Sequence, residues 1–298
     1  FKKSNFYTHL KNNKSSKFIV ISHYNIRTHF IFKALSRYDI SYSQLLVNSV
    51  PSNTENNERK RISNYFNFSK LKHVIENRIY STKNFALFNL KPPEHIICGG
   101  KNTLKNPQSF IRSKKTKLVW AHSFDYDQYL IEENNNTKLD DSLVSKKFIV
   151  FIDAPSPLVN HDSLIPNISS PLTAARYFPS LCKFFDFIEE KIGADVVIAS
   201  HPKSNHSSNP DYYGNRNVYR DMTLKLIKHS ELVINRNSTA INFAIMYNKP
   251  IIFHTTSEIE EHLAMRSQIK SMANLLNFSP LNIDSNYCDI DLNNLLKV

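Results

Sequence analysis

Short apolar runs, each followed at once by polar residues, recur along the second half of this chain. The runs lie at residues 147–153, 195–198, 231–234 and 250–253, and β-branched, leucine and aromatic residues dominate them. They have the length and composition of strands that are buried on both faces, as in a parallel sheet. Helical patterns separate them at about 172–192 and 240–247. This order predicts alternating strands and helices, which is typical of a parallel α/β domain.

The first half of the chain shows the same alternation. Strands are predicted at 17–22, 94–100 and 117–122, and a helix is predicted at about 26–36. Residues 1–16 are polar and basic with little periodicity, so we expect them to form a loose arm.

A polar stretch separates the two halves. Residues 132–147 contain few apolar positions and include the run Asn134-Asn135-Asn136, which makes them the best candidate for a linker. We therefore expect two Rossmann-like domains in tandem, at residues 1–140 and 141–298, with their boundary in this stretch.

Polar clusters follow two of the predicted strands directly. The first is His201-Pro202-Lys203-Ser204-Asn205, and the second is the run 235–240, which contains Asn237, Ser238 and Thr239. Open α/β sheets bind ligands at the carboxyl ends of their strands. Ser238 or Thr239 could cap the following helix and offer a hydroxyl and free N–H groups to an anion. With the imidazole of His201, these residues predict a phosphate site, although turn and capping roles alone would also account for them.

Three acids also follow predicted strands. Asp125 and Asp127 come soon after the strand at 117–122, and Asp153 ends the strand at 147–153. Each is a candidate for acid–base chemistry or acceptor binding, and the alternative is that one caps a helix. An extended backbone would place Asp125 and Asp127 on one side, whereas a helix start would fan them apart. The pair is formally a D-x-D triplet, but it lies far from the phosphate cluster in the sequence, and we expect no metal.

Composition constrains the partners and the compartment. Of the 298 residues, 41% are hydrophobic and 21% charged, as in ordinary globular proteins, and the net charge of +12 predicts an anionic partner. No nucleic-acid-binding motif is visible, so an anionic membrane surface or a polyanionic acceptor is expected and no specific nucleic acid. Three widely spaced cysteines without metal-ligand spacing indicate a reducing, cytoplasmic setting.

Several phosphate-binding and hydrolytic motifs are missing from the sequence. With four glycines, the chain has no GxGxxG fingerprint and no P-loop. The GxSxG elbow of α/β-hydrolases is missing as well. Phosphate binding is therefore expected to rest on helix starts and side chains.

The pair formed by His201-Pro202 and Ser238-Thr239 resembles the HP and serine/threonine motifs of bacterial sialyltransferases and polysialyltransferases. Capsule enzymes that transfer Kdo are similar. The order of Trp120-Ala121-His122-Ser123, Phe151-Ile152-Asp153 and His201-Pro202 also resembles surface-polysaccharide proteins found with such enzymes. The resemblance covers the second half of the chain better than the first.

This resemblance implies a GT-B fold, in which two Rossmann-like domains face a central cleft. The C-terminal domain would bind a CMP-activated acidic sugar (sialic acid, a related nonulosonate or Kdo) and the N-terminal domain a surface glycan or glycolipid acceptor. It further implies a glycosyltransferase without a separate cofactor. Because no metal-ligand set stands out in the sequence, a metal-independent mechanism is expected, and the cysteine usage and positive charge predict a location in the cytoplasm or on the inner face of the membrane.

One feature of the family is missing from this sequence. The acidic-acidic-Gly motif that supplies the general base there is absent here, so Asp125 or Asp127 is expected to be the base, with Asp153 as a further candidate. The alternatives are a UDP-sugar transferase or epimerase, and a non-catalytic protein that binds polysaccharide.

Overall fold

The computed structural model describes residues 3–46, 87–100, 103–104, 110–135, 143, 146–157, 172–204, 210–285 and 287. The chain divides into two compact units, of which the first ends at Phe124 and the second begins at Asp125. Both are built on parallel sheets with helices, so the predicted α/β class is confirmed. No helix within the described ranges combines the length and the apolar character that crossing a membrane requires.

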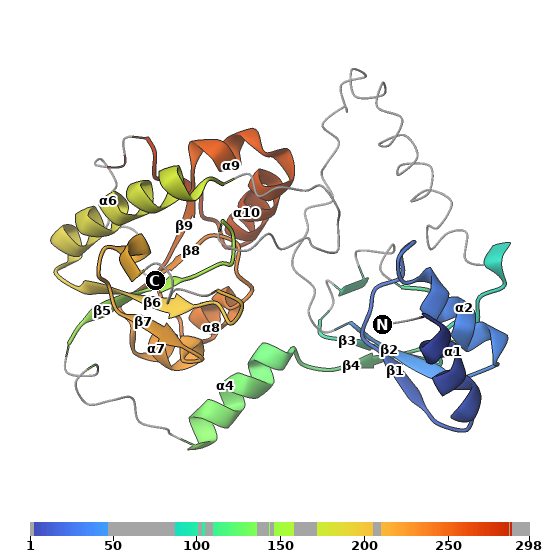
Figure 1. The fold of residues 1–298 in the computed structure, drawn as a ribbon. Coiled ribbons are helices and arrows are strands. Elements are labelled where there is room, and N and C mark those ends of the chain that lie inside the picture. The colour runs from blue at the N-terminus through green and yellow to red at the C-terminus, as the bar shows by residue number, and fades with distance from the viewer. Residues whose placement is uncertain are drawn as a thin grey trace, which may run out of the picture. The chain divides into compact units, whose positions relative to one another are not determined.

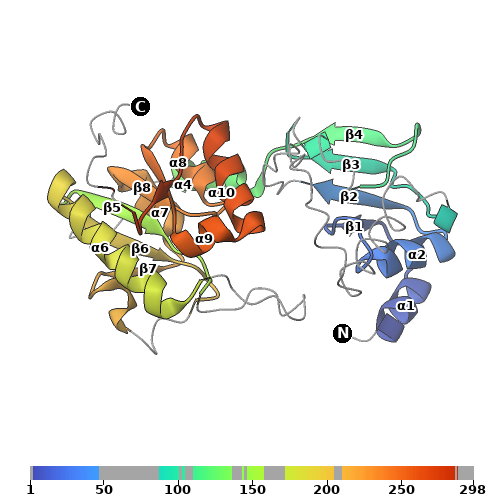
Figure 2. The same cartoon turned by 90° about the horizontal axis from the view of Figure 1, so that it is seen from above.

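The first unit contains a parallel sheet of four described strands in the order β1-β2-β3-β4, which Figure 2 shows side by side. The strands are β1 (Phe18–Val20), β2 (Tyr42–Leu46), β3 (His95–Cys98) and β4 (Lys117–Trp120), and the helices are α1 (Lys3–Asn12) and α2 (His29–Arg37). Three of these strands and α2 match the sequence prediction. Strand β2 was not predicted, because the polar residues Ser43 and Gln44 interrupt its apolar positions and leave no continuous apolar run.

The expectation of a loose N-terminal arm is wrong. Residues 3–12 form α1, and Leu10 on this helix is fully buried in the same apolar cluster as Phe32 and Leu35 of α2. Phe6 of α1 also contacts Phe30 of α2, with ring centroids 5.8 Å apart. Packing of a few apolar side chains, rather than the polar and basic composition of the segment, determines its structure.

The second unit contains a parallel sheet of six described strands in the order β10-β9-β8-β5-β6-β7 (Figure 1). The strands are β5 (Phe148–Ile152), β6 (Asp195–Ser200), β7 (Val218–Arg220), β8 (Leu232–Asn235), β9 (Ile251–Thr255) and β10 (Leu281–Asn282). The helices are α4 (Phe124–Asn135), α6 (Ala174–Ile192), the 3₁₀ turn η5 (Pro210–Tyr213), α7 (Thr223–His229), α8 (Ile241–Met246), α9 (Ser257–Glu261) and α10 (Leu263–Leu275).

Helices cover both faces of this sheet, as Figure 1 shows. Alternate residues of β5 serve the two faces, with Phe151 in the cluster under α6 and Val150 in the cluster under α7 and α8. All five residues of β5 are therefore buried, which explains why its sequence is a continuous apolar run. Helix α6 ends at Gly193, whose φ of 71° is the left-handed conformation that glycine adopts without strain.

The division between the units comes earlier than the boundary expected at residues 132–147. Helix α4 belongs to the second unit almost entirely, because Tyr129 and Glu133 on it contact that unit. The rings of Tyr129 and Tyr247 have centroids 5.0 Å apart, and Glu133 forms an ion pair of 2.9 Å with Lys228. The side chains with which α4 contacts the second unit are polar and aromatic, so the sequence of this helix resembles that of a linker. Residues 136–142 lie outside the described residues.

Candidate functional site

The strand order places a natural ligand-binding edge in the second unit. From β5 the chain proceeds outward through β6 and β7, then returns to the other side of β5 as β8 and proceeds outward through β9 and β10. Numbered within the unit, this is the 3-2-1-4-5-6 order of dinucleotide-binding sheets, in which ligands bind outside the carboxyl ends of the strands where the order reverses. Here that point lies between β5 and β8, so the residues that follow these strands are the site candidates.

Asp153 follows β5 and is 3% exposed. One carboxylate oxygen, Oδ2, accepts a hydrogen bond of 3.1 Å from the backbone N–H of His201, and the other, Oδ1, accepts one of 2.7 Å from the Tyr213 hydroxyl. Burial and the negative charge of Asp153 raise the pKa of Tyr213 well above its usual value, so its hydroxyl stays a donor. Asp153 therefore connects the ends of β5 and β6 and lies next to the backbone of His201.

His201 lies in a turn that directly follows β6. Its Nδ1 accepts a hydrogen bond of 3.1 Å from the backbone N–H of Lys203, which leaves Nε2 as the ring nitrogen that carries the proton. Arg220 at the end of β7 donates a hydrogen bond of 2.6 Å to the carbonyl of Pro202. Pro202 and Lys203 are exposed, and Asn205 lies outside the described residues. Hydrogen bonds from Lys203 and Arg220 thus fix this turn, and the imidazole of His201 is half-buried in it.

The cluster after β8 is built differently from the predicted helix cap. Ala240, and not Ser238 or Thr239, is the N-cap of α8, and no side chain caps this helix of six residues. The hydroxyl of Ser238 accepts instead from the N–H of Ala240 at 3.3 Å, while the fully buried Asn235 accepts from the N–H of Ser238 at 3.1 Å. These local bonds form a turn that delays the helix start. Asn237, Ser238 and Thr239 still line the edge, but the helix-start phosphate site is not supported.

Arg236 was not among the predicted site residues, although it lies at the switch point of the sheet. It is 1% exposed, and its Nη2 donates a hydrogen bond of 3.0 Å to the carbonyl of Ser156, three residues beyond Asp153. Its guanidinium lies over the ring of Tyr177 on α6, 5.2 Å from the centroid. The Nη1 atom has no hydrogen-bond partner among the described residues. From sequence alone, a charged residue within a polar run is expected to be solvated, and only the fold shows that this one is buried.

Two buried side chains, those of Tyr177 and His254, lie beside Arg236. The hydroxyl of Tyr177 lies 3.1 Å from Nε2 of His254, the fourth residue of β9, and the two rings are stacked. Burial and the nearby charge of Arg236 lower the pKa of His254 to about 3. Burial raises the pKa of Tyr177 to about 12. Both groups are therefore neutral at physiological pH and offer hydrogen-bonding groups without charge.

The two acids of α4 point in different directions. Both lie in the first turn of the helix, which fans them apart, so Asp125 is half-buried and Asp127 is exposed. Oδ2 of Asp125 accepts a hydrogen bond of 2.7 Å from Nδ2 of Asn242 in the first turn of α8. The sequence placed Asp125 in the N-terminal domain, but its contacts are with the second unit, and Asn242 lies close along the chain to Ser238 and Thr239.

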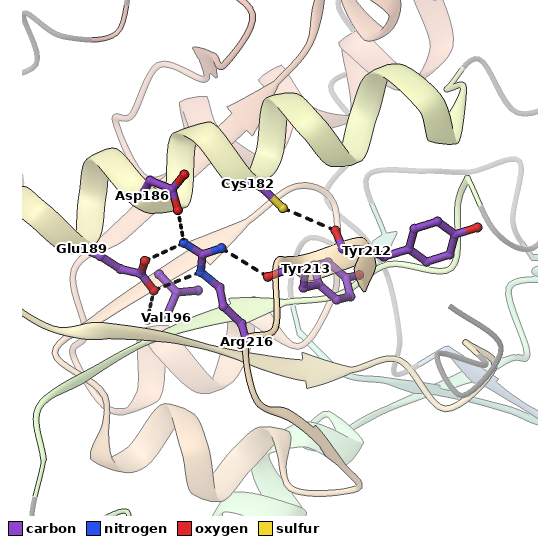
Figure 3. A network of polar contacts seen from close by, with 7 residues as sticks. All are labelled: Cys182, Asp186, Glu189, Val196, Tyr212, Tyr213 and Arg216. Atoms are coloured by element: carbon purple, nitrogen blue, oxygen red, sulfur yellow. Dashed lines mark hydrogen bonds and ion pairs between the residues drawn. The ribbon is translucent and has the colours of Figure 1, made fainter. Parts of the chain in front are cut away.

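An ion-pair network around Arg216 joins α6 to the turn that carries Tyr213 (Figure 3). Arg216 donates from Nε and Nη2 to Glu189 and from Nη2 to Asp186, both on α6. Its Nη1 donates to the backbone carbonyl of Tyr213 at 3.2 Å. The network therefore fixes the backbone around Tyr213, whose hydroxyl donates the hydrogen bond to Asp153.

The chemistry of this edge favours an anion. It combines a buried guanidinium, an imidazole with its proton on Nε2, and a run of hydroxyl and amide side chains, all of which donate hydrogen bonds. In the parts of the chain that the structure describes, no group of three or more His, Cys, Asp or Glu side chains is arranged to hold a metal ion.

Comparison with known proteins gives similarity at the level of whole structures. No family model matches the chain, and no curated protein matches its sequence. Among solved structures, S. aureus MnaA with UDP has a TM-score of 0.49 and 12% identity, covering 92% of this chain and 72% of that one. UDP-GlcNAc 2-epimerase from Neisseria meningitidis bound to UDP-GlcNAc has a TM-score of 0.46 and 14% identity, covering 99% and 80%.

A glycosyltransferase structure is similar to the chain to the same degree. The glycotransferase of kitacinnamycin has a TM-score of 0.48 and 12% identity, covering 99% of this chain and 70% of that one. At these identities the comparison identifies no family for the chain.

Proposed function

We propose that this protein is a glycosyltransferase that takes a nucleotide-activated sugar at the carboxyl edge of the second unit's sheet. The donor that we favour is a CMP-linked acidic sugar, namely sialic acid, a related nonulosonate or Kdo. The observation that carries the proposal is the coincidence of the two resembling motifs with the switch point of a 3-2-1-4-5-6 sheet. His201 follows β6, and Ser238 and Thr239 follow β8, so β6 and β8, which pair with β5 on its two sides, bring the two motifs to one edge of the sheet.

Each residue then has a definite task in transfer of the sugar. The leaving group is a nucleotide phosphate, and hydrogen-bond donors that meet its developing charge lower the barrier. His201 would donate through Nε2–H, and the hydroxyls of Ser238 and Thr239 would donate beside it. Asp153 positions His201 through the backbone bond described above. Asp125, whose carboxylate lies against Asn242 at the start of α8, is our candidate for the base on the acceptor hydroxyl, with Asp127 as the alternative.

Two other interpretations compete with this one. A UDP-sugar transferase or epimerase would use the same edge with a diphosphate, and the absence of an acidic-acidic-Gly triplet keeps open a protein that binds polysaccharide without turnover.

The first unit would bind the acceptor, a surface glycan or glycolipid, and the net charge of +12 would favour the cytoplasmic face of an anionic membrane.

Calorimetric titration of CMP against UDP separates the donors. We expect CMP to bind more tightly, whereas a clear preference for UDP would exclude the CMP assignment. Incubation with CMP- and UDP-sugars and oligosaccharide acceptors separates the classes, because turnover excludes a binding protein and nucleotide binding without any turnover excludes the transferase.

Substitution of His201 tests the site itself. Since its donor would act mainly on the departing phosphate, His201→Ala should lower kcat about 10²–10³-fold while nucleotide affinity falls much less. The half-buried side chain contributes little to the core, so the melting temperature should stay close to that of the wild type. Full activity in a folded His201→Ala protein would remove this residue from the site.

A further inference from the structure

The second unit contains two buried arginines whose surroundings differ sharply. The side chain of Arg216 is 9% exposed and is paired with the carboxylates of Asp186 and Glu189 (Figure 3). Its third nitrogen donates to a backbone carbonyl, so every nitrogen of this guanidinium has a partner. Arg216 thus shows how this fold satisfies an arginine whose role is structural.

Arg236 is more deeply buried, and its hydrogen-bond partners are neutral: Nε donates to Oδ1 of Asn237 at 3.3 Å and Nη2 to the carbonyl of Ser156 at 3.0 Å. Among the described residues, no carboxylate forms an ion pair with it, and Nη1 has no hydrogen-bond acceptor. Asp153, the acid that follows β5, accepts hydrogen bonds from His201 and Tyr213, and its charge acts on Tyr177 and Tyr213 together with that of Arg236, but it forms no ion pair with Arg236. Taking a cation out of water without a counter-ion is costly, so an anion is the missing partner that physical chemistry expects here.

The two rings beside Arg236, those of Tyr177 and His254, do not supply that negative charge. Tyr177 lies under the guanidinium with its pKa raised to about 12 by burial, so it stays a neutral phenol. His254 is neutral, and burial together with the positive charge of Arg236 lowers its pKa to about 3. Two buried hydroxyls at the same edge, Ser204 Oγ after β6 and Thr255 Oγ1 at the end of β9, also lack partners among the described residues. They are further donors without an acceptor.

We propose that Arg236 is the residue that binds the phosphoryl group of the ligand at this edge. A phosphoryl group offers several acceptor oxygens and pairs with the planar guanidinium through parallel N–H bonds. At this edge, donors without partners among the described residues lie at or just beyond the ends of three different strands, and a phosphoryl group suits them better than a carboxylate, which has two oxygens. The inference rests on the proposed function only in taking a nucleotide sugar as the natural ligand. It adds the residue on which binding of the phosphate depends.

The test compares Arg236→Gln and Arg236→Lys with the wild type by calorimetry. The probes are CMP, UDP, cytidine, inorganic pyrophosphate and free N-acetylneuraminic acid. For the phosphate-bearing compounds that the wild type binds, we expect affinity to fall about 10–100-fold in Arg236→Gln. A smaller loss of affinity is expected in Arg236→Lys, which keeps the positive charge but not the planar guanidinium that donates two parallel hydrogen bonds. Cytidine should bind all three proteins equally. Lys191→Gln is the matched control for charge, because Lys191 lies 14 residues beyond Tyr177 on α6, about 21 Å along the helix.

Stability without ligand separates binding from a structural role. Because Arg236 has no counter-ion among the residues that the structure describes, Arg236→Gln should melt within about 3 °C of the wild type. Arg216→Gln leaves two carboxylates without their partner and should melt clearly lower. Unchanged phosphate affinity in Arg236→Lys or Arg236→Gln overturns the proposal, and so does a wild type that binds none of the phosphate compounds. A variant that loses only N-acetylneuraminic acid binding overturns the phosphoryl assignment in favour of a carboxylate.

A failure of the proposed function has a different signature. If no nucleotide sugar is turned over while pyrophosphate or CMP binding still depends on Arg236, the transferase is refuted and the phosphoryl site stands. If Arg236→Gln does not fold, the comparison of Arg236→Lys with the wild type decides.

Discussion

The hydrogen bond between Tyr213 and Asp153 is the contact in the site whose energy can be worked out most directly. Tyr213 is 1% exposed and Asp153 is 3% exposed, and 2.7 Å separates the hydroxyl from Oδ1. A buried hydrogen bond to a charged acceptor contributes about 1.5–3 kcal/mol. Tyr213→Phe removes the donor and little volume, so it should lower the free energy of unfolding by about this amount. For a unit of this size, that corresponds to a fall of about 3–12 °C in melting temperature.

A double-mutant cycle isolates the bond from other effects of the substitutions. Asp153→Asn puts an amide where two donors, the Tyr213 hydroxyl and the His201 N–H, need acceptors, so it should also destabilise. If the two side chains bond in solution, Tyr213→Phe should cost much less in a protein that already carries Asp153→Asn. We expect a coupling energy of about 1–2 kcal/mol, measured by differential scanning calorimetry or urea unfolding.

Tyr212→Phe is the control, because the Tyr212 ring stacks on Phe178 with centroids 4.2 Å apart and the substitution keeps that stack. It should change stability by less than about 0.5 kcal/mol. Strict additivity of Tyr213→Phe and Asp153→Asn would refute the bond, and so would a Tyr213→Phe protein as stable as the Tyr212→Phe control.

Two further predictions concern pH and the general base. The pKa of His254 is about 3 in the folded protein and near 6.5 when unfolded, so the unfolded chain binds the extra proton between these values. The free energy of unfolding should therefore fall as the pH drops below about 6.5, by at most about 1.4 kcal/mol per pH unit. Urea unfolding at about pH 7 and pH 5 should show that the free energy of unfolding depends less on pH in His254→Gln than in the wild type. An equal dependence in both proteins would contradict the buried neutral histidine. Substitution of the base by asparagine should lower kcat about 10²–10⁴-fold with little change in donor affinity. We expect this for Asp125→Asn, and a larger loss in Asp127→Asn under steady-state assay would reassign the base.

Local sequence determined most of the sheet in the second unit. Strands β5, β6, β8 and β9 are buried on both faces, so each needs a continuous apolar run, and such a run is visible without any knowledge of the partners. The same holds for the polar residues that follow them, since the carboxyl end of a strand is defined by the chain itself. That His201 and Asp153 follow strands of one parallel sheet could therefore be predicted from sequence alone.

Tertiary packing decided the features that the sequence left open or that were predicted wrongly. Helix α1 forms because Leu10 is buried against α2, and α4 joins the second unit because Tyr129 and Glu133 find partners on Tyr247 and Lys228. Such contacts join residues far apart in the chain, and no local pattern of hydrophobic positions encodes them.

Arg236 shows the same limit at the site. In the sequence it is one cation in a polar run, and in the fold it is a buried cation between Tyr177 and the Ser156 carbonyl. Whether a charged side chain has a counter-ion depends on which strands meet at the switch point. The sequence by itself determined at which edge of the sheet a ligand would bind. Only the tertiary structure decided which charged side chain is buried at that edge.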